Sequence, residues 1–197
     1  MSDTAAPSKR LPKAERREQL LETAMEIVRE QGTDALTLAW VAERAGVSKP
    51  IAYEHFGTRS GLLIALYLQI DERQMARLTQ DFERLPKRLG DVATLIGSSY
   101  MSCFRTAGPE CHAIFAALKG DELMERVQQE LIGGYVAFYR DLLAPYSKVS
   151  EAELQRRCIA IVGAGEALSR EMSHGRIEEN DAATTLATLI VAIMSRG

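Results

Sequence analysis

The sequence has little of what several protein classes require. Its 197 residues include 3 cysteines, an odd number without the spacing of a disulfide framework, which predicts reduced and mostly buried thiols. The longest uncharged stretch, residues 182–195, is shorter than the roughly 20 residues that a membrane-spanning helix needs. The first residues are polar where a secretory signal would be apolar. We therefore expect a cytoplasmic protein without a membrane partner.

Patterns typical of catalysis or metal binding are also missing. The 3 histidines, His55, His112 and His174, lie far apart in the sequence, and no cysteine–histidine pair has the spacing of a metal site. Cys111 is adjacent to His112, which is a poor arrangement for chelation. The sequence contains no nucleophile elbow, phosphate loop or dinucleotide fingerprint. We expect neither an enzyme nor a bound metal or cofactor.

Positive charge does not predominate overall, but it gathers at one end. The formal net charge of −3 argues against a surface coated with positive charge. Within residues 1–17 the charged side chains are mostly basic: Lys9, Arg10, Lys13, Arg16 and Arg17, against Asp3 and Glu15. Such an arm fits a local contact with phosphate, and it also fits a merely solvated tail.

Almost every segment has the apolar period of a helix, and none has the alternation of a strand. An apolar content of 46% is enough for a core. Ser150 followed by Glu153 forms a capping box at one helix start. We predict an all-α protein of about nine helices, over residues 14–31, 38–45, 49–55, 59–85, 87–106, 110–118, 121–143, 150–173 and 181–195.

The most informative stretch begins at Thr37 and reads TLAWVAERAGVSKPIAYEHF. Thr37 can cap a first short helix, and Gly46 can form the tight turn after it. Ser48 can cap a second short helix, and Pro50 suits its first turn because no N–H group is needed there. Lys49 and Tyr53 are then left on the outer face. This is the arrangement of a helix-turn-helix, whose second helix lies in the major groove of DNA.

This stretch resembles the N-terminal region of the tetracycline-repressor (TetR) family. In that family three helices end in a Tyr-x-x-Phe segment, followed by a lysine-containing start of the fourth helix. Here Tyr53 and Phe56 match that segment, and Arg59 stands where lysine is usual. The motif covers about residues 14–66, and the helix count and chain length agree with the family throughout.

The resemblance implies a set of DNA-contacting residues. They are Thr37, Ser48, Lys49, Pro50, Ile51, Tyr53, His55, Thr58 and Arg59. Residues 49–51 would face base edges, whereas Thr37, Tyr53 and Thr58 would donate hydrogen bonds to phosphates and Arg59 would add charge. We expect a disordered basic arm over residues 1–13, a DNA-binding domain over 14–57 and a bundle for ligand binding and dimerisation over 58–197.

The resemblance also implies an effector cavity in the bundle. Aromatic and sulfur side chains with polar tips are typical of a mostly apolar pocket, although a plain core position is the simpler interpretation for any one of them. The candidate lining residues are Tyr100, Met101, Phe104, His112, Phe115, Tyr135, Phe138 and Glu166. Nothing in the sequence identifies the effector, which we expect to be a small, mostly apolar molecule.

The last two predicted helices, residues 150–173 and 181–195, are apolar on more than one side. We expect them to pair with their symmetry mates in a homodimer.

The leading hypothesis is a ligand-responsive transcriptional repressor that binds a near-palindromic operator as a dimer and is released by its effector. One alternative is a DNA-binding regulator that needs no ligand. Another is a helical enzyme or small-molecule carrier.

Overall fold

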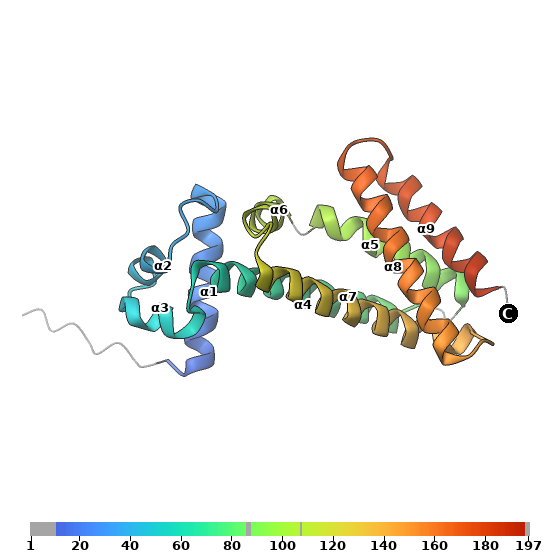
Figure 1. Ribbon diagram of the computed structural model, residues 1–197, viewed down its shortest axis with the longest axis horizontal. Helices are drawn as coiled ribbons and strands as arrows, with labels where there is room; N and C mark the ends of the chain where they lie inside the picture. Colours follow the sequence, from blue (N-terminus) through green and yellow to red (C-terminus); the bar gives the residue numbers. More distant parts are fainter. Residues whose placement is uncertain (1–10, 86–87, 107, 196–197) are drawn as a thin grey trace, which may run out of the picture. The chain divides into compact units, whose positions relative to one another are not determined.

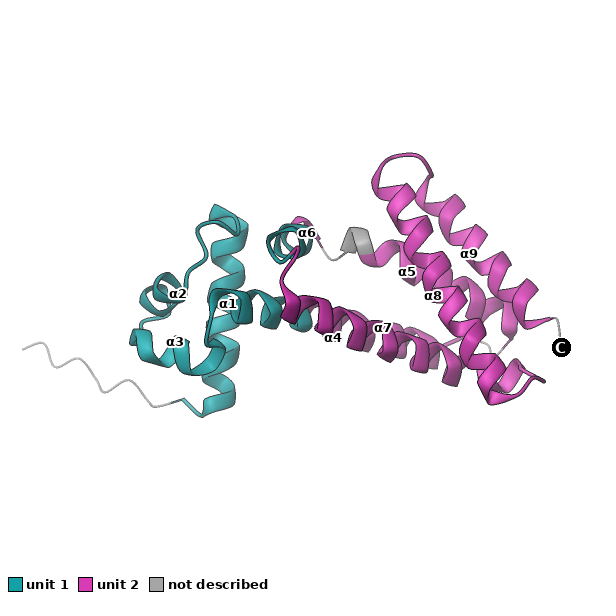
Figure 2. Ribbon diagram, in the orientation of Figure 1, with its two compact units in different colours: residues 1–69, 110–118 teal, residues 70–109, 119–197 magenta. Residues whose placement is uncertain are grey.

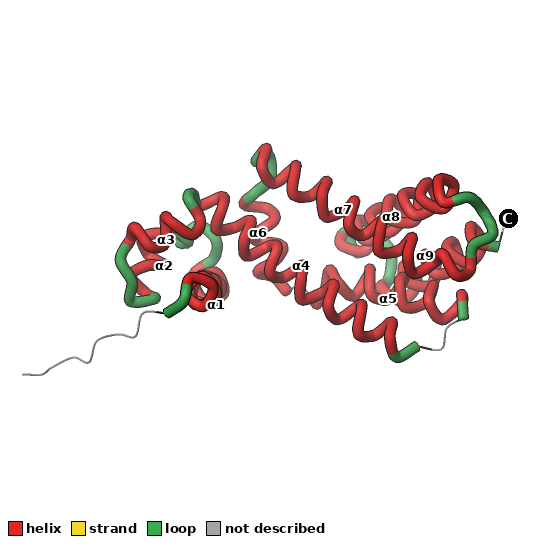
Figure 3. Tube along the Cα trace, turned by 90° about the horizontal axis from the view of Figure 1, so that it is seen from below, coloured by secondary structure: helices red, strands yellow, loops and turns green. Residues whose placement is uncertain are grey.

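The computed structural model describes residues 11–85, 88–106 and 108–195, and all regular elements in these ranges are helical (Figures 1 and 3). This confirms the predicted all-α class. The α-helices are α1 (Lys13–Gln31), α2 (Leu38–Arg44), α3 (Lys49–Phe56), α4 (Arg59–Glu83), α5 (Leu89–Thr106), α6 (Gly108–Ala117), α7 (Glu122–Leu143), α8 (Glu151–Ser173) and α9 (Glu179–Met194). In the described part of the chain, no helix combines the length and apolar character needed to cross a membrane.

The chain forms two compact units (Figure 2). Unit 1 consists of the residues up to Gln69 together with Glu110–Leu118, and unit 2 consists of Ile70–Pro109 and Lys119–Gly197. Unit 1 therefore includes the first part of α4 and most of α6, beyond the expected boundary at residue 57. Of the expected arm over residues 1–13, residues 1–10 lie outside the described part of the chain, and Lys13 already belongs to α1.

The core of unit 1 forms where apolar residues recur at helical spacing. Helix α1 buries residues that include Leu20, Leu21, Ala24, Ile27 and Val28. Helix α2 buries Leu38, Val41 and Ala42, as the sequence predicts. Helix α3 buries only Ala52 and Phe56, which lie one turn apart. The remaining face of α3 is therefore left for another role.

Unit 2 is built on close packing of α5 against α9, with α8 lying against α7 and α9. Gly97 makes the approach of α5 possible, because a Cβ atom there would lie 2.4 Å from the carbonyl oxygen of Ala183 in α9. The core contains fully buried residues from each of these helices, including Ile96, Leu143, Ile161 and Ile190.

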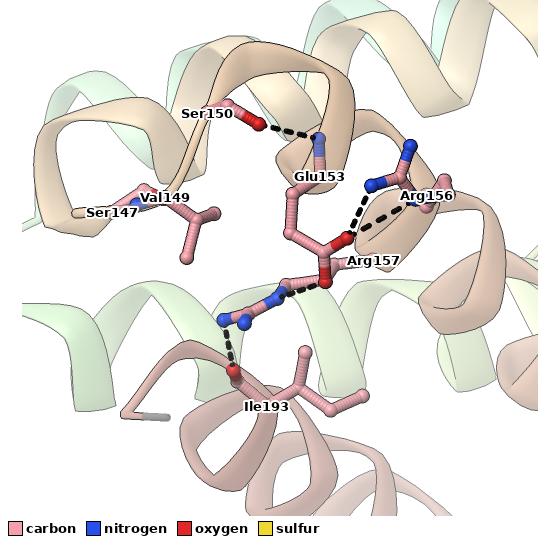
Figure 4. Close-up of polar contacts among 7 residues, drawn as sticks. All are labelled: Ser147, Val149, Ser150, Glu153, Arg156, Arg157 and Ile193. Atoms are coloured by element: carbon pink, nitrogen blue, oxygen red, sulfur yellow. Dashed lines mark hydrogen bonds and ion pairs between the residues drawn. The ribbon is translucent and has the colours of Figure 1, made fainter. Parts of the chain in front are cut away.

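A short 3-10 turn, η1 (Ala144–Tyr146), follows α7, and α8 begins after it. The Ser150 hydroxyl accepts a hydrogen bond from the Glu153 N–H at 3.3 Å, as predicted. The Glu153 side chain, however, does not complete a capping box. Its carboxylate accepts hydrogen bonds from Arg156 at 2.7 Å and from Arg157 at 3.1 Å, and Arg157 also donates to the carbonyl of Ile193 at 2.6 Å (Figure 4). Arg157 thus ties the start of α8 to the end of α9.

Candidate functional site

Helices α2 and α3 are joined by the tight turn that the sequence predicts. Gly46 has a φ of +68°, a left-handed conformation that glycine adopts at little cost. The N–H of Val47 then donates to the carbonyl of Ala42 at 2.9 Å, which closes the turn. This geometry fixes the direction in which α3 leaves α2, and it makes the pair a helix-turn-helix.

The two predicted helix caps differ in the structure. The Thr37 hydroxyl accepts a hydrogen bond from the N–H of Trp40 at 3.1 Å, as expected for a cap. Ser48 occupies the N-cap position of α3, but its side chain makes no capping hydrogen bond, so that part of the prediction is wrong. Ser48 is exposed. Its hydroxyl is therefore not used to hold α3 together.

The outer face of α3 carries the side chains that the sequence places there. Lys49 and Pro50 are exposed, and 52% of Tyr53 is open to solvent. Ile51 is only partly exposed. On the opposite face Ala52 is fully buried, which anchors the helix. Tyr53 therefore presents a large, half-exposed phenol on a helix that is anchored from its other face. Such a side chain is well placed to contact another molecule.

Thr58 and Arg59 lie at the start of α4. The Thr58 hydroxyl accepts a hydrogen bond from the N–H of Gly61 at 3.0 Å. The Arg59 guanidinium donates to the carbonyl oxygens of Leu36 at 3.0 Å and Thr33 at 2.6 Å. Arg59 thus holds α4 to the loop before α2, whereas the family resemblance implies a charge contact with phosphate.

Positive charge from α1 surrounds the end of α3. Lys13 forms a 3.1 Å ion pair with Glu54, and the Arg17 guanidinium lies 5.1 Å from the centre of the Phe56 ring. The pKa of His55 is lowered, chiefly by burial; the charge of Glu54 opposes this shift, and the charges of Lys13, Arg17 and Arg16 add to it. The sequence shows these cations but not their place beside α3. The sequence feature that could have indicated this position is the helical spacing of the cations at positions 13, 16 and 17.

The eight candidate pocket residues are divided between the two units. His112 and Phe115 lie in α6 and belong to unit 1, where 43% of Phe115 is exposed and its ring centre lies 6.1 Å from that of Tyr67. In unit 2, Met101 is fully buried and Glu166 is exposed on α8. The side chain of Phe104 lies outside the described part of the structure.

Tyr100, Tyr135 and Phe138 lie within unit 2, which also holds polar contacts that the sequence interpretation missed. The Tyr135 hydroxyl donates to the Asp71 carboxylate at 2.9 Å, and Gln74 contacts Cys103 through both its amide nitrogen and its oxygen. Burial raises the pKa of Asp71, against the Tyr135 hydrogen bond, and raises the pKa of Tyr135. The helical period of the sequence could have indicated that Asp71 is partly buried, because it places Asp71 on the same face of α4 as Met75 and Leu78.

Comparison with known proteins addresses the helix-turn-helix first. The family model described as "Bacterial regulatory proteins, tetR family" matches residues 20–66. The transcriptional activator FasR of Mycolicibacterium smegmatis is 42% identical over 69 residues, which are 35% of this chain and 30% of that protein. The transcriptional regulator BetI of Rhizobium meliloti is 42% identical over 50 residues, or 25% of each chain. The chain thus matches less than a third of the length of these relatives.

Solved structures share the fold over most of the chain. A tetR-family transcriptional regulator from Streptomyces coelicolor superposes with a TM-score of 0.66 and 19% identity, covering 94% of this chain and 82% of that one. FadR from Bacillus subtilis, in complex with stearoyl-CoA, has a TM-score of 0.62 and 16% identity, covering 90% and 97%. Residues 20–66 thus match the model of the tetR family of bacterial regulatory proteins, and the chain shares the fold of these solved structures.

Proposed function

We propose that this protein is a homodimeric transcriptional repressor, which binds a near-palindromic operator through α3 and is released by a small effector held in unit 2. The observation that carries the proposal is the exposed face of α3. The exposed side chains on this face are those of Lys49, Pro50 and Tyr53. The helix is anchored on its opposite face by the buried Ala52 and Phe56. The cations of α1 beside this helix add attraction for phosphate.

The exposed residues of α3 suit two kinds of DNA contact. The ammonium group of Lys49 can bind the acceptors of guanine, and the apolar Pro50 can contact a thymine methyl group. The hydroxyl of Tyr53 can donate to a phosphate, which positions the helix without reading sequence. The Ser48 hydroxyl, which makes no capping bond, is open to a second phosphate contact.

A second copy of this chain would cover the outer faces of α8 and α9. On α8, 55% of Ile159 is exposed, and its exposed neighbours include the small residues Gly163 and Ala167. On α9, Thr184 and Thr188 are exposed one turn apart. Small residues around an exposed isoleucine allow close helix packing across a two-fold axis. Such a dimer would present two α3 helices to half-sites about 34–36 Å apart.

The DNA-binding proposal can be tested by fluorescence anisotropy on duplexes selected from a random library. We expect binding that weakens as salt increases. Lys49→Ala should lose about 1–3 kcal/mol of discrimination between base pairs, whereas Tyr53→Phe should weaken binding to all duplexes by a similar factor. Lys148→Ala is the control, because this exposed lysine lies in unit 2.

Two outcomes would count against this assignment. Salt-independent or undetectable binding by the native chain would refute the DNA-binding function. A change of base preference in Tyr53→Phe, but not in Lys49→Ala, would reverse the two roles. For the dimer, light scattering that shows a stable monomer at micromolar concentration would refute the proposed interface.

A further inference from the structure

Asp71 carries a half-buried carboxylate. It lies on the part of α4 that belongs to unit 2, and the Tyr135 hydroxyl is its hydrogen-bond donor at 2.9 Å. No lysine, arginine or histidine among the described residues forms an ion pair with it. The next residues along the same face of α4 are apolar: Met75 packs against the core and Leu78 is buried within it. A carboxylate in such surroundings is costly unless a positive charge compensates it.

A cluster of aromatic rings on α7 adjoins this carboxylate through Tyr135. The ring centre of Tyr135 lies 6.2 Å from that of Tyr139, and the ring centre of Phe138 lies 6.1 Å from that of Tyr139. Tyr139 is buried, whereas Tyr135, Phe138 and Asp71 each keep part of their surface accessible. The faces of aromatic rings attract cations, most strongly ammonium groups that have been removed from water.

A carboxylate and aromatic rings together select one class of ligand. An acidic or neutral ligand would leave the Asp71 charge uncompensated. A metal ion is a poor match, because no group of three histidine, cysteine or acidic residues in the described structure is placed to hold one. A positive charge carried on an apolar body satisfies both the carboxylate and the rings.

We propose that Asp71 and Tyr135, with the adjoining ring of Phe138, bind a small organic cation, a protonated amine or a quaternary ammonium group on an apolar body. The binding claim stands by itself. Naming this cation as the effector rests on the proposed function. The site narrows the expected effector from a mostly apolar molecule to one that also carries a single positive charge.

The test is titration calorimetry on the full chain without DNA. The probes are phenyltrimethylammonium and its uncharged isostere tert-butylbenzene, which have nearly the same shape. We expect the cation to bind at least about tenfold more tightly than the isostere. Asp71→Asn, which keeps an acceptor for Tyr135, should remove this preference and leave the isostere unaffected. Asp141→Asn is the matched control, because its carboxylate is on α7 in the same unit and is largely exposed.

Equal binding of the two probes to the native chain, no binding of the cation, or an unchanged preference in Asp71→Asn would each overturn the proposal. If circular dichroism shows that Asp71→Asn does not fold, the comparison of the two probes on the native chain decides. A chain that binds the cation but no duplex DNA would retain this site and refute the proposed function. Release of DNA by the cation, in the native chain but not in Asp71→Asn, would support both.

Discussion

Gly97 of α5 faces the carbonyl oxygen of Ala183 in α9 so closely that a side chain has no space between them. A Cβ atom at position 97 would lie 2.4 Å from that oxygen and 3.3 Å from the N atom of Ala187. Both neighbours are backbone atoms, so neither can move without shifting α9. Glycine at this position therefore fixes how closely the two helices of unit 2 pack.

Replacing this glycine should destabilise unit 2. We expect Gly97→Ala to lower the free energy of unfolding by about 1–3 kcal/mol, because α5 and α9 must separate to admit the methyl group. Gly90→Ala is the control, since it lies in the first turn of α5 with no atom within 4 Å of its added Cβ. Urea denaturation of both variants measures the difference. Equal stability of the two would contradict the close packing.

Thr37 and Ser48 occupy equivalent cap positions but should respond differently to substitution. Thr37→Ala removes a capping hydrogen bond and should cost about 1 kcal/mol of stability. Ser48→Ala removes none, so its stability should change little while its affinity for duplex DNA falls. Thermal unfolding and fluorescence anisotropy on the same samples separate the two effects. A larger stability loss in Ser48→Ala would show that the Ser48 hydroxyl does cap α3.

The stability contribution of Asp71 should depend on pH. Burial raises its pKa in the folded state, so the folded chain holds this proton to a higher pH than the unfolded chain does. The contribution is therefore favourable below the unfolded pKa of about 3.9 and is lost as the pH rises through the folded pKa. Asp71→Asn should be more stable than the native chain at pH 7, with a gain that shrinks toward pH 4. Urea denaturation across this range checks the sign, and a gain that grows on acidification would contradict it.

Cys158 should be chemically inert in the folded protein. It is fully buried in α8, and burial raises the pKa of its thiol to about 11. Since the thiolate is the reactive form, little of it exists at pH 8. Cys158→Ser should leave the number of thiols that react quickly with Ellman's reagent unchanged in native protein, and lower it by one in urea. A loss of one fast-reacting thiol in the native state would show that Cys158 is accessible.

Local patterns in the sequence predicted most helix bounds, because the residues that begin or end a helix lie at or beside its termini. α6 shows the limit of such rules. The sequence pattern predicts a helix from residue 110, but α6 begins at Gly108, because the proline at position 109 is tolerated in a first turn. Contacts between residues that are far apart in the sequence could not be predicted in this way. Tyr135 and Asp71 are 64 positions apart, and Arg59 binds a carbonyl 26 positions away, so no local periodicity reveals either contact.

The discontinuous composition of unit 1 has a consequence for engineering. The buried Ile114 and the ion pair between Arg29 and Glu110 both come from α6, which follows α5 in the chain. A fragment that ends at Gln69 would lack this helix and would expose the surface that it covers. A chimera that borrows the helix-turn-helix unit must therefore transplant two segments, residues 11–69 and 110–118. Likewise, a single protease cut after Gln69 would leave the rest of unit 1 attached to unit 2.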